Sequence, residues 1–339
     1  MFKKYKKKIL MSVALGAAVF LAFSIYADFD NLLKAFREFS WIYFPLVLAL
    51  SFGNYIIRYY KWEYYRKLLE IDLKPKASFL IFMATFVMSV TPGKMGELLK
   101  SYLVREENGT PISKSAPIIL AERLTDFISV VFLCIAGSFV FNYGKELIIG
   151  SGIFFLGCVA LISSRKISLG IISILEKIKA IEKISEKVRE AYESIYTLVK
   201  IKPLVIAVIM SIFAWFLECL GLYVVLRVYS SFTHIDVGIL SSVFIYGFST
   251  IIGSIAMLPG GLGLTEASLT GLMQYLNIPK DISVASTFII RIATLWFSVL
   301  VGVISVYFYQ RYSHKDLENI DEISKIKLKN SFEVNHYLD

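Results

Sequence analysis

Seven charged residues interrupt apolar stretches of this sequence: Glu97, Glu122, Arg123, Asp126, Glu218, Glu266 and Arg291. A charged side chain at the centre of a bilayer costs about 2.5–3.5 kcal/mol on insertion scales, so such residues usually face a partner or a polar cavity. One interpretation is structural ion pairing, with either arginine bound to Glu97 or Glu266. The other is a binding cavity, which depth in the apolar stretch favours for Arg291 and Glu218.

Two of these carboxylates, Glu122 and Asp126, are spaced i,i+4 and would share one face of a helix. They follow a polar, basic segment closely. For this pair, closeness to the cytoplasmic surface of the membrane is therefore an equal alternative to a cavity.

Two Pro-Gly motifs, 91-TPGKMGE-97 and 258-LPGGLGLTE-266, each follow an apolar run and precede a new helix. A helix that begins inside a membrane presents unpaired N–H groups and about half a positive charge. Lys94 would add a full charge, and glycines let a ligand approach the backbone. This combination favours an anion such as phosphate. The site predicted here comprises the seven charged residues together with Pro92, Gly93, Lys94, Gly96, Pro259, Gly260, Gly261 and Gly263.

The composition indicates the class of protein that must position these residues. Of 339 residues, 56% are hydrophobic and 19% are charged, and the mean hydropathy is +0.64. Soluble proteins carry about 25% charged residues. We therefore predict an all-α, polytopic membrane helix bundle. The net charge of +9 is interpreted as membrane topology, not as a sign of nucleic-acid binding.

Six apolar runs are long enough to cross a bilayer, which takes about 20 residues: Ile9–Tyr26, Ser40–Ile57, Ala116–Phe141, Leu147–Ser163, Pro203–Val228 and Ser283–Tyr309. Two others end in Pro-Gly. Ala77–Thr91 would form only about 22 Å of helix, short of the roughly 30 Å hydrocarbon core. Val237–Leu258 has the length either to span or to turn back. Aromatic clusters at 41–44 and 59–65 are interpreted as interfacial belts.

Basic residues predict the orientation. Five lysines lie among the first eight residues, six basic residues in 58–76 and nine in 164–202. All three regions are cytoplasmic only if Ala77–Thr91 re-enters the membrane without crossing it. The N-terminus is then expected in the cytoplasm, and the protein in the plasma membrane. If Val237–Leu258 also re-enters, as we expect, a polar tail over 313–339 is cytoplasmic as well; if that run spans, the tail lies outside. Segment 171–200 has amphipathic spacing and is predicted to lie on the cytoplasmic membrane surface, or alternatively to bind a partner as a coiled coil.

Equal spacing suggests an internal duplication within a single domain over 1–312. Arg123 follows Pro92 by 31 residues and Arg291 follows Pro259 by 32. The predicted halves are about 77–163 and 237–312. Because their hairpins would enter from opposite sides, we expect an inverted repeat with two re-entrant Pro-Gly hairpins, a transporter architecture.

Three motifs, PGKMGELLKSYL, AERLTD and PGGLGLTEASL, resemble the transmembrane domain of lysylphosphatidylglycerol synthase/flippase proteins. The resemblance covers about residues 5–312 and extends to stand-alone flippase-like proteins of bacteria and archaea. It implies movement of an aminoacylated phospholipid or, from relatives associated with glycosyltransferases, a polyprenyl-phosphate-linked sugar. Lys94 and Lys100 stand where the family often has arginine, which keeps the charge but weakens a bidentate phosphate contact.

The expected function is translocation of an anionic lipid, without catalysis, metal or cofactor. The expected partners are membrane lipids and a glycosyltransferase or lipid-modifying enzyme, and no nucleic acid. Two alternatives remain open: a membrane-embedded lipid-modifying enzyme, with a carboxylate such as Asp126 as base, and a non-transporting scaffold that acts through segment 171–200. The three histidines lie outside the spans, and there is no phosphate-binding motif typical of ATPases.

Overall fold

The computed structural model describes residues 2–91, 97–138, 145–176 and 184–313, and all regular secondary structure in these ranges is helical. The prediction of an all-α bundle is therefore confirmed. The first half of the chain contains α1 (Phe2–Ala27), α2 (Phe29–Glu38), α3 (Phe44–Leu68), α4 (Pro75–Ala84), η2 (Thr85–Met88), α5 (Leu99–Asn108), α6 (Ile112–Gly137) and α7 (Lys145–Ser163). The second contains α8 (Arg165–Leu175), α10 (Ser185–Leu198), α11 (Ile201–Thr233), α12 (Ile239–Ile255), η4 (Pro259–Gly261), α13 (Leu264–Tyr275), α14 (Lys280–Arg291), η5 (Ile292–Trp296) and α15 (Phe297–Ser313).

Several helices have the length and apolar character of membrane spans. In the described ranges, four runs meet both conditions: Trp41–Leu68, Glu146–Ser163, Ile201–Thr233 and Lys280–Ser313. Residues Ala14–Ala27 and Phe29–Glu38 are bent by 96° and would together add a fifth. Helix α6 has 26 residues but carries Glu122, Arg123 and Asp126 in its middle. The chain is thus a multi-pass membrane helix bundle.

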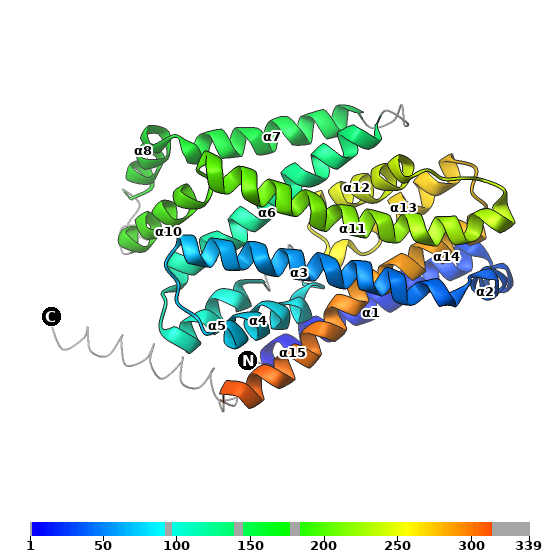
Figure 1. The fold of residues 1–339 in the computed structure, drawn as a ribbon, viewed down its shortest axis with the longest axis horizontal. Helices are drawn as coiled ribbons and strands as arrows, with labels where there is room; N and C mark the ends of the chain where they lie inside the picture. The colour runs from blue at the N-terminus through cyan, green and yellow to red at the C-terminus, as the bar shows by residue number, and fades with distance from the viewer. Residues whose placement is uncertain (1, 92–96, 139–144, 177–183, 314–339) are drawn as a thin grey trace.

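The helices run between two ends of an elongated molecule (Figure 1). One end carries α5, α8 and α10, and the last turn of α15 lies toward it. The opposite end carries α2 and the turn from α13 to α14. We call these the terminal end and the α2 end.

Helix α4 begins at the terminal end, and helix α5 ends there. The side-chain amide of Asn108, at the end of α5, donates a hydrogen bond to the carbonyl of Asp72, just before α4 (2.5 Å). Near the same place, the hydroxyl of Tyr309 donates to Glu107 (3.2 Å). The start of α4 and the end of α5 therefore lie at the same end of the molecule.

Helices α12 and α13 pack against each other and belong to the α2 end (Figure 1). The hydroxyl of Tyr26 donates to Gln274 near the end of α13 (3.2 Å), and that of Tyr229, near the end of α11, donates to the carbonyl of Ala35 (2.9 Å). The apolar run Val237–Leu258, which could have spanned by length, contains a helix of only 17 residues.

Close helix contact positions the core of the bundle. A Cβ added at Gly302 would lie 2.1 Å from the backbone nitrogen of Val87, so α15 and η2 touch backbone to backbone only because residue 302 is glycine. Buried thiols also contribute to packing, because Cys134 and Cys219 lie in the main hydrophobic core.

The amphipathic segment 171–200 is not one continuous helix. Helix α8 ends at Leu175 and α10 begins at Ser185, with 177–183 outside the described residues. The two helices fold back on each other through the ion pairs Arg189–Glu176 (2.7 Å) and Arg165–Glu193. Helix α10 turns Tyr192, Ser194 and Leu198 inward and packs on α6, whereas Ile171 and Ile174 of α8 are exposed.

The aromatic cluster at 59–65 is only partly an interfacial belt, because Trp62 and Tyr65 are completely buried. The indole N–H of Trp62 donates to Ser78 (2.9 Å). The cluster at 41–44 differs: Trp41, Ile42 and Tyr43 are exposed at the α2 end, as expected of a belt.

Candidate functional site

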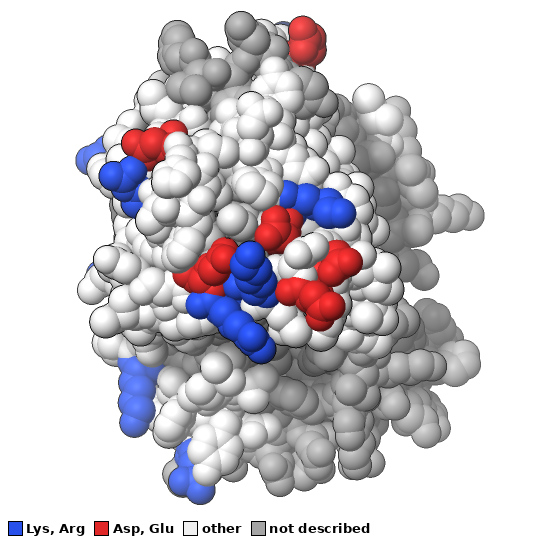
Figure 2. Space-filling view, turned by 90° about the vertical axis from the view of Figure 1, so that its right-hand side faces the viewer, with Lys and Arg blue, Asp and Glu red and all other residues white. Residues whose placement is uncertain are grey.

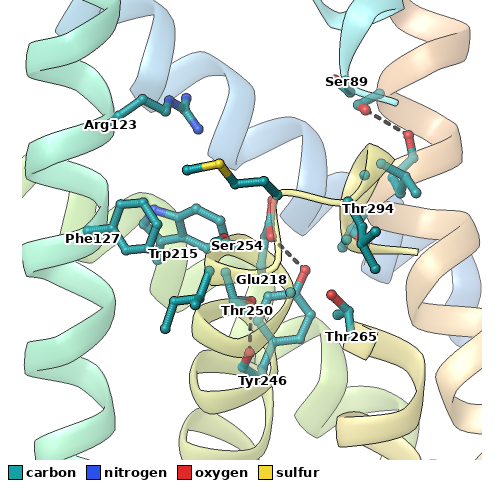
Figure 3. A pocket seen from close by; sticks show the side chains of 18 of the residues that line it. Ser89, Arg123, Phe127, Trp215, Glu218, Tyr246, Thr250, Ser254, Thr265 and Thr294 are labelled. Carbon is teal, nitrogen blue, oxygen red and sulfur yellow. Dashed lines mark hydrogen bonds between the residues drawn. The ribbon is translucent and has the colours of Figure 1, made fainter. Parts of the chain in front are cut away.

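A cavity of about 650 Å³ lies between α3, α6, α7, α11, α12 and the η4 turn. The charged residues on its described wall are Arg58, Arg123, Glu218 and Arg291. Glu218 is near the middle of the 33-residue helix α11. Figure 3 shows Arg123 projecting from α6 toward the same space as Glu218 and Trp215. Two arginines and one carboxylate of the predicted site thus share one cavity.

The second Pro-Gly turn is held by an arginine. Gly260 and Gly263 have φ angles of 61° and 89°, a left-handed conformation that glycine adopts without strain. The Gly263 N–H donates to one oxygen of Glu266 (2.7 Å), whose other oxygen accepts from Nε of Arg291 (2.6 Å). Nη2 of Arg291 donates to the carbonyl of Gly260 (2.6 Å). The structure therefore brings these four predicted residues together, and Arg291 and Glu266 form the ion pair that was one of the two interpretations.

The first Pro-Gly motif is described only from Glu97 onward, because Pro92, Gly93, Lys94 and Gly96 lie outside the described residues. Nη2 of Arg123 lies 3.3 Å from Oε2 of Glu97 and 3.3 Å from Oδ2 of Asp126. Arg123 therefore contacts the glutamate of the first motif, as Arg291 contacts that of the second, but over a longer distance.

Asp126 is the centre of a buried charge cluster. Its Oδ1 lies 2.6 Å from Nζ of Lys61 and accepts from the hydroxyl of Ser211 (3.0 Å). Nη2 of Arg58 lies 3.7 Å from Oδ2. Three cations, including Arg123, thus surround one carboxylate. Buried charges persist only when paired, because burial removes their hydration.

Glu122 belongs to a separate pair that does not line the cavity. Its Oε2 lies 2.7 Å from Nζ of Lys100, which also lies 4.8 Å from the ring centres of both Trp62 and Phe82. Aromatic faces attract such a cation. Glu122 and Asp126 are both buried within the bundle, and their shared helix face serves two different ion pairs.

Glu218 accepts a hydrogen bond from the hydroxyl of the buried Tyr246 on α12 (2.6 Å), as Figure 3 shows. Nearby, the hydroxyl of Tyr55 donates to the carbonyl of Thr294 (2.9 Å). Pro259 and Gly261 belong to η4, and Gly261 lines the cavity while Pro259 does not.

Four further residues of the site, Arg58, Lys61, Trp215 and Tyr246, are not among those predicted from the sequence. Arg58 and Lys61 were counted as cytoplasmic basic residues. Their i,i+3 spacing beside apolar residues was the available signal, because it places both cations on one face of α3. The roles of Trp215 and Tyr246 had no signal in a sequence this rich in aromatic residues. Among the residues that the structure describes, no three His, Cys, Asp or Glu side chains gather as metal ligands.

Comparison with known proteins places this architecture in a family. The family described as "Lysylphosphatidylglycerol synthase TM region" matches residues 9–302. A UPF0104 membrane protein of Methanothermobacter thermautotrophicus is 22% identical over 343 residues, covering 94% of this chain and 100% of that protein. A UPF0104 membrane protein of Methanocaldococcus jannaschii is 25% identical over 237 residues, covering 69% of this chain and 98% of that protein. A third, from Pyrococcus horikoshii, is 23% identical and covers 88% of this chain and 96% of that protein. With nearly its whole length matched, the chain belongs to the lysylphosphatidylglycerol synthase transmembrane-region family.

Proposed function

We propose that this protein moves an anionic lipid between the leaflets of the plasma membrane, through the cavity between α3, α6, α11 and α12. The observation that carries this proposal is the presence of Arg58, Arg123 and Arg291 on the wall of one cavity in an apolar bundle. Ionisable residues in membrane proteins commonly mark a substrate path. An aminoacylated phospholipid and a polyprenyl-phosphate-linked sugar both offer a phosphate to such a site. We further propose that a partner glycosyltransferase or lipid-modifying enzyme supplies the lipid.

The wall of the cavity favours a lipid over a small soluble anion. A volume of about 650 Å³ falls in the usual range of ligand pockets, about 300–1,000 Å³, and suits a head group. The same wall includes apolar residues that are also exposed on the outside of the bundle, notably Phe154 (64%), Ile255 (54%) and Met257 (70%). These side chains offer an apolar path on which acyl or polyprenyl tails remain in the bilayer.

Access from both leaflets would follow from an inverted repeat. Helices α4 and α5 belong to the terminal end, and α12 and α13 to the α2 end (Figure 1). Each pair contains a Pro-Gly motif, and the glutamate after it contacts an arginine 26 residues later (Glu97 and Arg123) or 25 residues later (Glu266 and Arg291). These correspondences support two re-entrant hairpins that approach a central site from opposite leaflets.

We assign the terminal end, with both termini, to the cytoplasm. Figure 2 views the α2 end, where basic and acidic side chains alternate. The segments 27–39, 227–236 and 280–281 at this end contain four basic and five acidic residues, whereas 164–202 at the terminal end contains nine basic ones. This difference matches the excess of Lys and Arg on the cytoplasmic side of membrane proteins.

Leaflet exchange in proteoliposomes tests the proposed function. Fluorescently labelled phosphatidylglycerol and phosphatidylcholine are incorporated, and a membrane-impermeant quencher reports how much label reaches the outer leaflet. The wild type should speed exchange of phosphatidylglycerol, and Arg58→Gln should slow it. Arg227→Gln is the matched control, because Arg227 is exposed at the α2 end and pairs only with the exposed Asp236. The proposal fails if wild type and Arg58→Gln give the rate of empty liposomes for every anionic lipid class tried.

A further inference from the structure

We infer that the anionic head group binds in a subsite between α6 and α11, where the indole N–H of Trp215 and the guanidinium of Arg123 donate hydrogen bonds to its phosphate oxygens. This inference rests on the proposed function and identifies the residues of the cavity that receive the ligand. It also separates the two arginines of the predicted repeat: Arg123 contacts the ligand, whereas the donors of Arg291 hold the second Pro-Gly turn.

Trp215 lines the cavity and carries a buried donor. Its side chain is only 8% exposed, and its Nε1 is buried without a hydrogen-bond partner among the described residues. An indole N–H can only donate, so a buried one requires an acceptor. Two other tryptophans meet this requirement, since Trp62 donates to Ser78 (2.9 Å) and Trp41 to the carbonyl of Phe36 (3.0 Å). The acceptor for Trp215 is therefore expected to come from a ligand in the cavity that it lines.

Arg123 also has donors to offer. Its Nε and Nη2 make no hydrogen bond within the described residues, and its two ion pairs are 3.3 Å long. Arg291 differs, because two of its nitrogens donate over 2.6 Å. Asp126 does not depend on Arg123 for neutralisation, since Lys61 lies 2.6 Å from it. The planar fork of a guanidinium matches two oxygens of a phosphate.

The two donors face a common space. Besides the large cavity, Arg123 and Trp215 both line a smaller one of about 20 Å³, which they share with Asp126, Thr250 and Ser254. Figure 3 shows Arg123 and Trp215 on one side of the opening and Thr250 and Ser254 of α12 beneath it. A cation and a neutral donor, with hydroxyls nearby, form a set that recognises an oxyanion. Arg58 is a third cation near Asp126, and its Nη2 lies 3.7 Å from Oδ2 of that carboxylate.

Binding measurements on the purified full-length protein in phosphatidylcholine nanodiscs test this subsite. The probes are dihexanoyl phosphatidylglycerol and inorganic phosphate, titrated by calorimetry. Trp215→Phe keeps the aromatic ring but removes the N–H, and Arg123→Lys keeps the charge but removes the fork. Each should weaken phosphatidylglycerol binding about tenfold or more, the effect of losing a hydrogen bond to a charged group. Trp41→Phe is the matched control and should bind within about twofold of wild type, because Trp41 is exposed and lies outside the cavity.

The two probes distinguish the sources of the phosphate group. If phosphatidylglycerol and inorganic phosphate both bind, and the variants weaken the binding of each, the subsite recognises the phosphate itself. If only phosphatidylglycerol binds, the subsite recognises a lipid head group. The inference is overturned if both variants bind phosphatidylglycerol with wild-type affinity, or if neither probe binds the wild type.

A spectroscopic readout covers the case in which a variant unfolds. The chain contains four tryptophans, so a protein labelled with ¹⁵N at the indole nitrogen gives few NMR signals, and that of Trp215 is missing in Trp215→Phe. Phosphatidylglycerol should shift this signal of the wild type downfield, as a new acceptor would. An unchanged signal at saturating lipid would overturn the inference. The proposed function is judged separately. If the protein binds the lipid at this subsite but does not speed leaflet exchange, the subsite stands and the proposed translocation fails. If the protein speeds exchange but both variants bind the lipid as the wild type does, translocation stands and the subsite fails.

Discussion

Nε of Arg291 lies 2.6 Å from Oε1 of Glu266, and this ion pair connects the second Pro-Gly turn to helix α14. Glu266 is completely buried, and its other oxygen accepts the backbone N–H of Gly263 (2.7 Å). Arg291 also donates to the carbonyl of Gly260. One arginine and one glutamate thereby satisfy backbone groups that a turn inside an apolar bundle cannot give to water.

Removal of one partner from this pair should destabilise the protein strongly. Glu266→Ala leaves a buried guanidinium without its carboxylate, a loss of about 3–5 kcal/mol for a buried pair. Thermal unfolding in detergent should therefore show a much lower midpoint for Glu266→Ala. Asp236→Ala is the control, because its pair with Arg227 is exposed and such pairs contribute about 0–1 kcal/mol. Equal midpoints for the two variants would contradict a structural role for the buried pair.

Replacement of Asp126 should destabilise the protein more than replacement of its closest partner, Lys61. Asp126→Asn removes the carboxylate from among Arg58, Lys61 and Arg123, whereas Lys61→Met leaves Asp126 with two arginines. Loss of a carboxylate that three cations share costs more than loss of one of those cations, because the carboxylate then keeps two partners. Asp126→Asn should therefore lower the unfolding midpoint further than Lys61→Met does.

A double-mutant cycle gives the coupling between Lys61 and Asp126. The double variant should be more stable than the sum of the two single losses predicts, because contacting residues are not additive. Additive losses would show that the 2.6 Å contact contributes little to stability.

Close packing of α15 on η2 makes Gly302 intolerant of a methyl group. The new Cβ of Gly302→Ala would lie 2.1 Å from the backbone nitrogen of Val87, and no side-chain rotation relieves a backbone clash. Overpacking of this kind costs about 1–3 kcal/mol or more. Gly170→Ala is the matched control: Gly170 lies in α8 with no atom within 4 Å of the new Cβ, so it should be neutral or slightly stabilising. Thermal unfolding of the two variants should give shifts of opposite sign or very different size.

The link between α8 and α10 should weaken in acid. Hydrogen bonds from Arg189 hold the pKa of Glu176 below its ordinary value. A lowered folded-state pKa means that the stabilising contribution is present above the unfolded pKa and disappears as pH falls through the folded pKa. Hydrogen exchange should therefore show α8 less protected at about pH 3 than at pH 7, and Glu176→Gln should remove most of that difference. Because the pair is exposed, added salt should also reduce it. The same pH response in Glu176→Gln would assign it to other groups.

Composition predicted the polytopic helical class, and three motifs predicted membership of the family; both are confirmed. For Arg291 the sequence left two interpretations open, an ion pair and a binding cavity, and its depth in the apolar stretch favoured the cavity. The partners of Asp126 could not be predicted in this way. Lys61 is 65 residues from Asp126, and which side of α3 faces α6 depends on how the helices pack. Amphipathic spacing likewise could not predict the break between α8 and α10 in segment 171–200. Such spacing shows which face of a helix is apolar, but not where the chain folds back.

Glu218 should distinguish between the two classes of cargo in the proposed function. It lines the same cavity as Arg123 and accepts a hydrogen bond from Tyr246 (2.6 Å). A carboxylate there attracts an ammonium group and repels a phosphate. Glu218→Gln should therefore weaken binding of an aminoacylated phospholipid and strengthen binding of phosphatidylglycerol, each by severalfold. Calorimetric titration of both lipids into nanodiscs measures the two effects, with Glu193→Gln as the control because Glu193 lies in α10 outside the cavity. Opposite shifts for the two lipids identify Glu218 as a contact for the amine. A parallel weakening of both would instead assign it to the architecture of the cavity, and it would favour a cargo without an amine, such as a polyprenyl-phosphate-linked sugar.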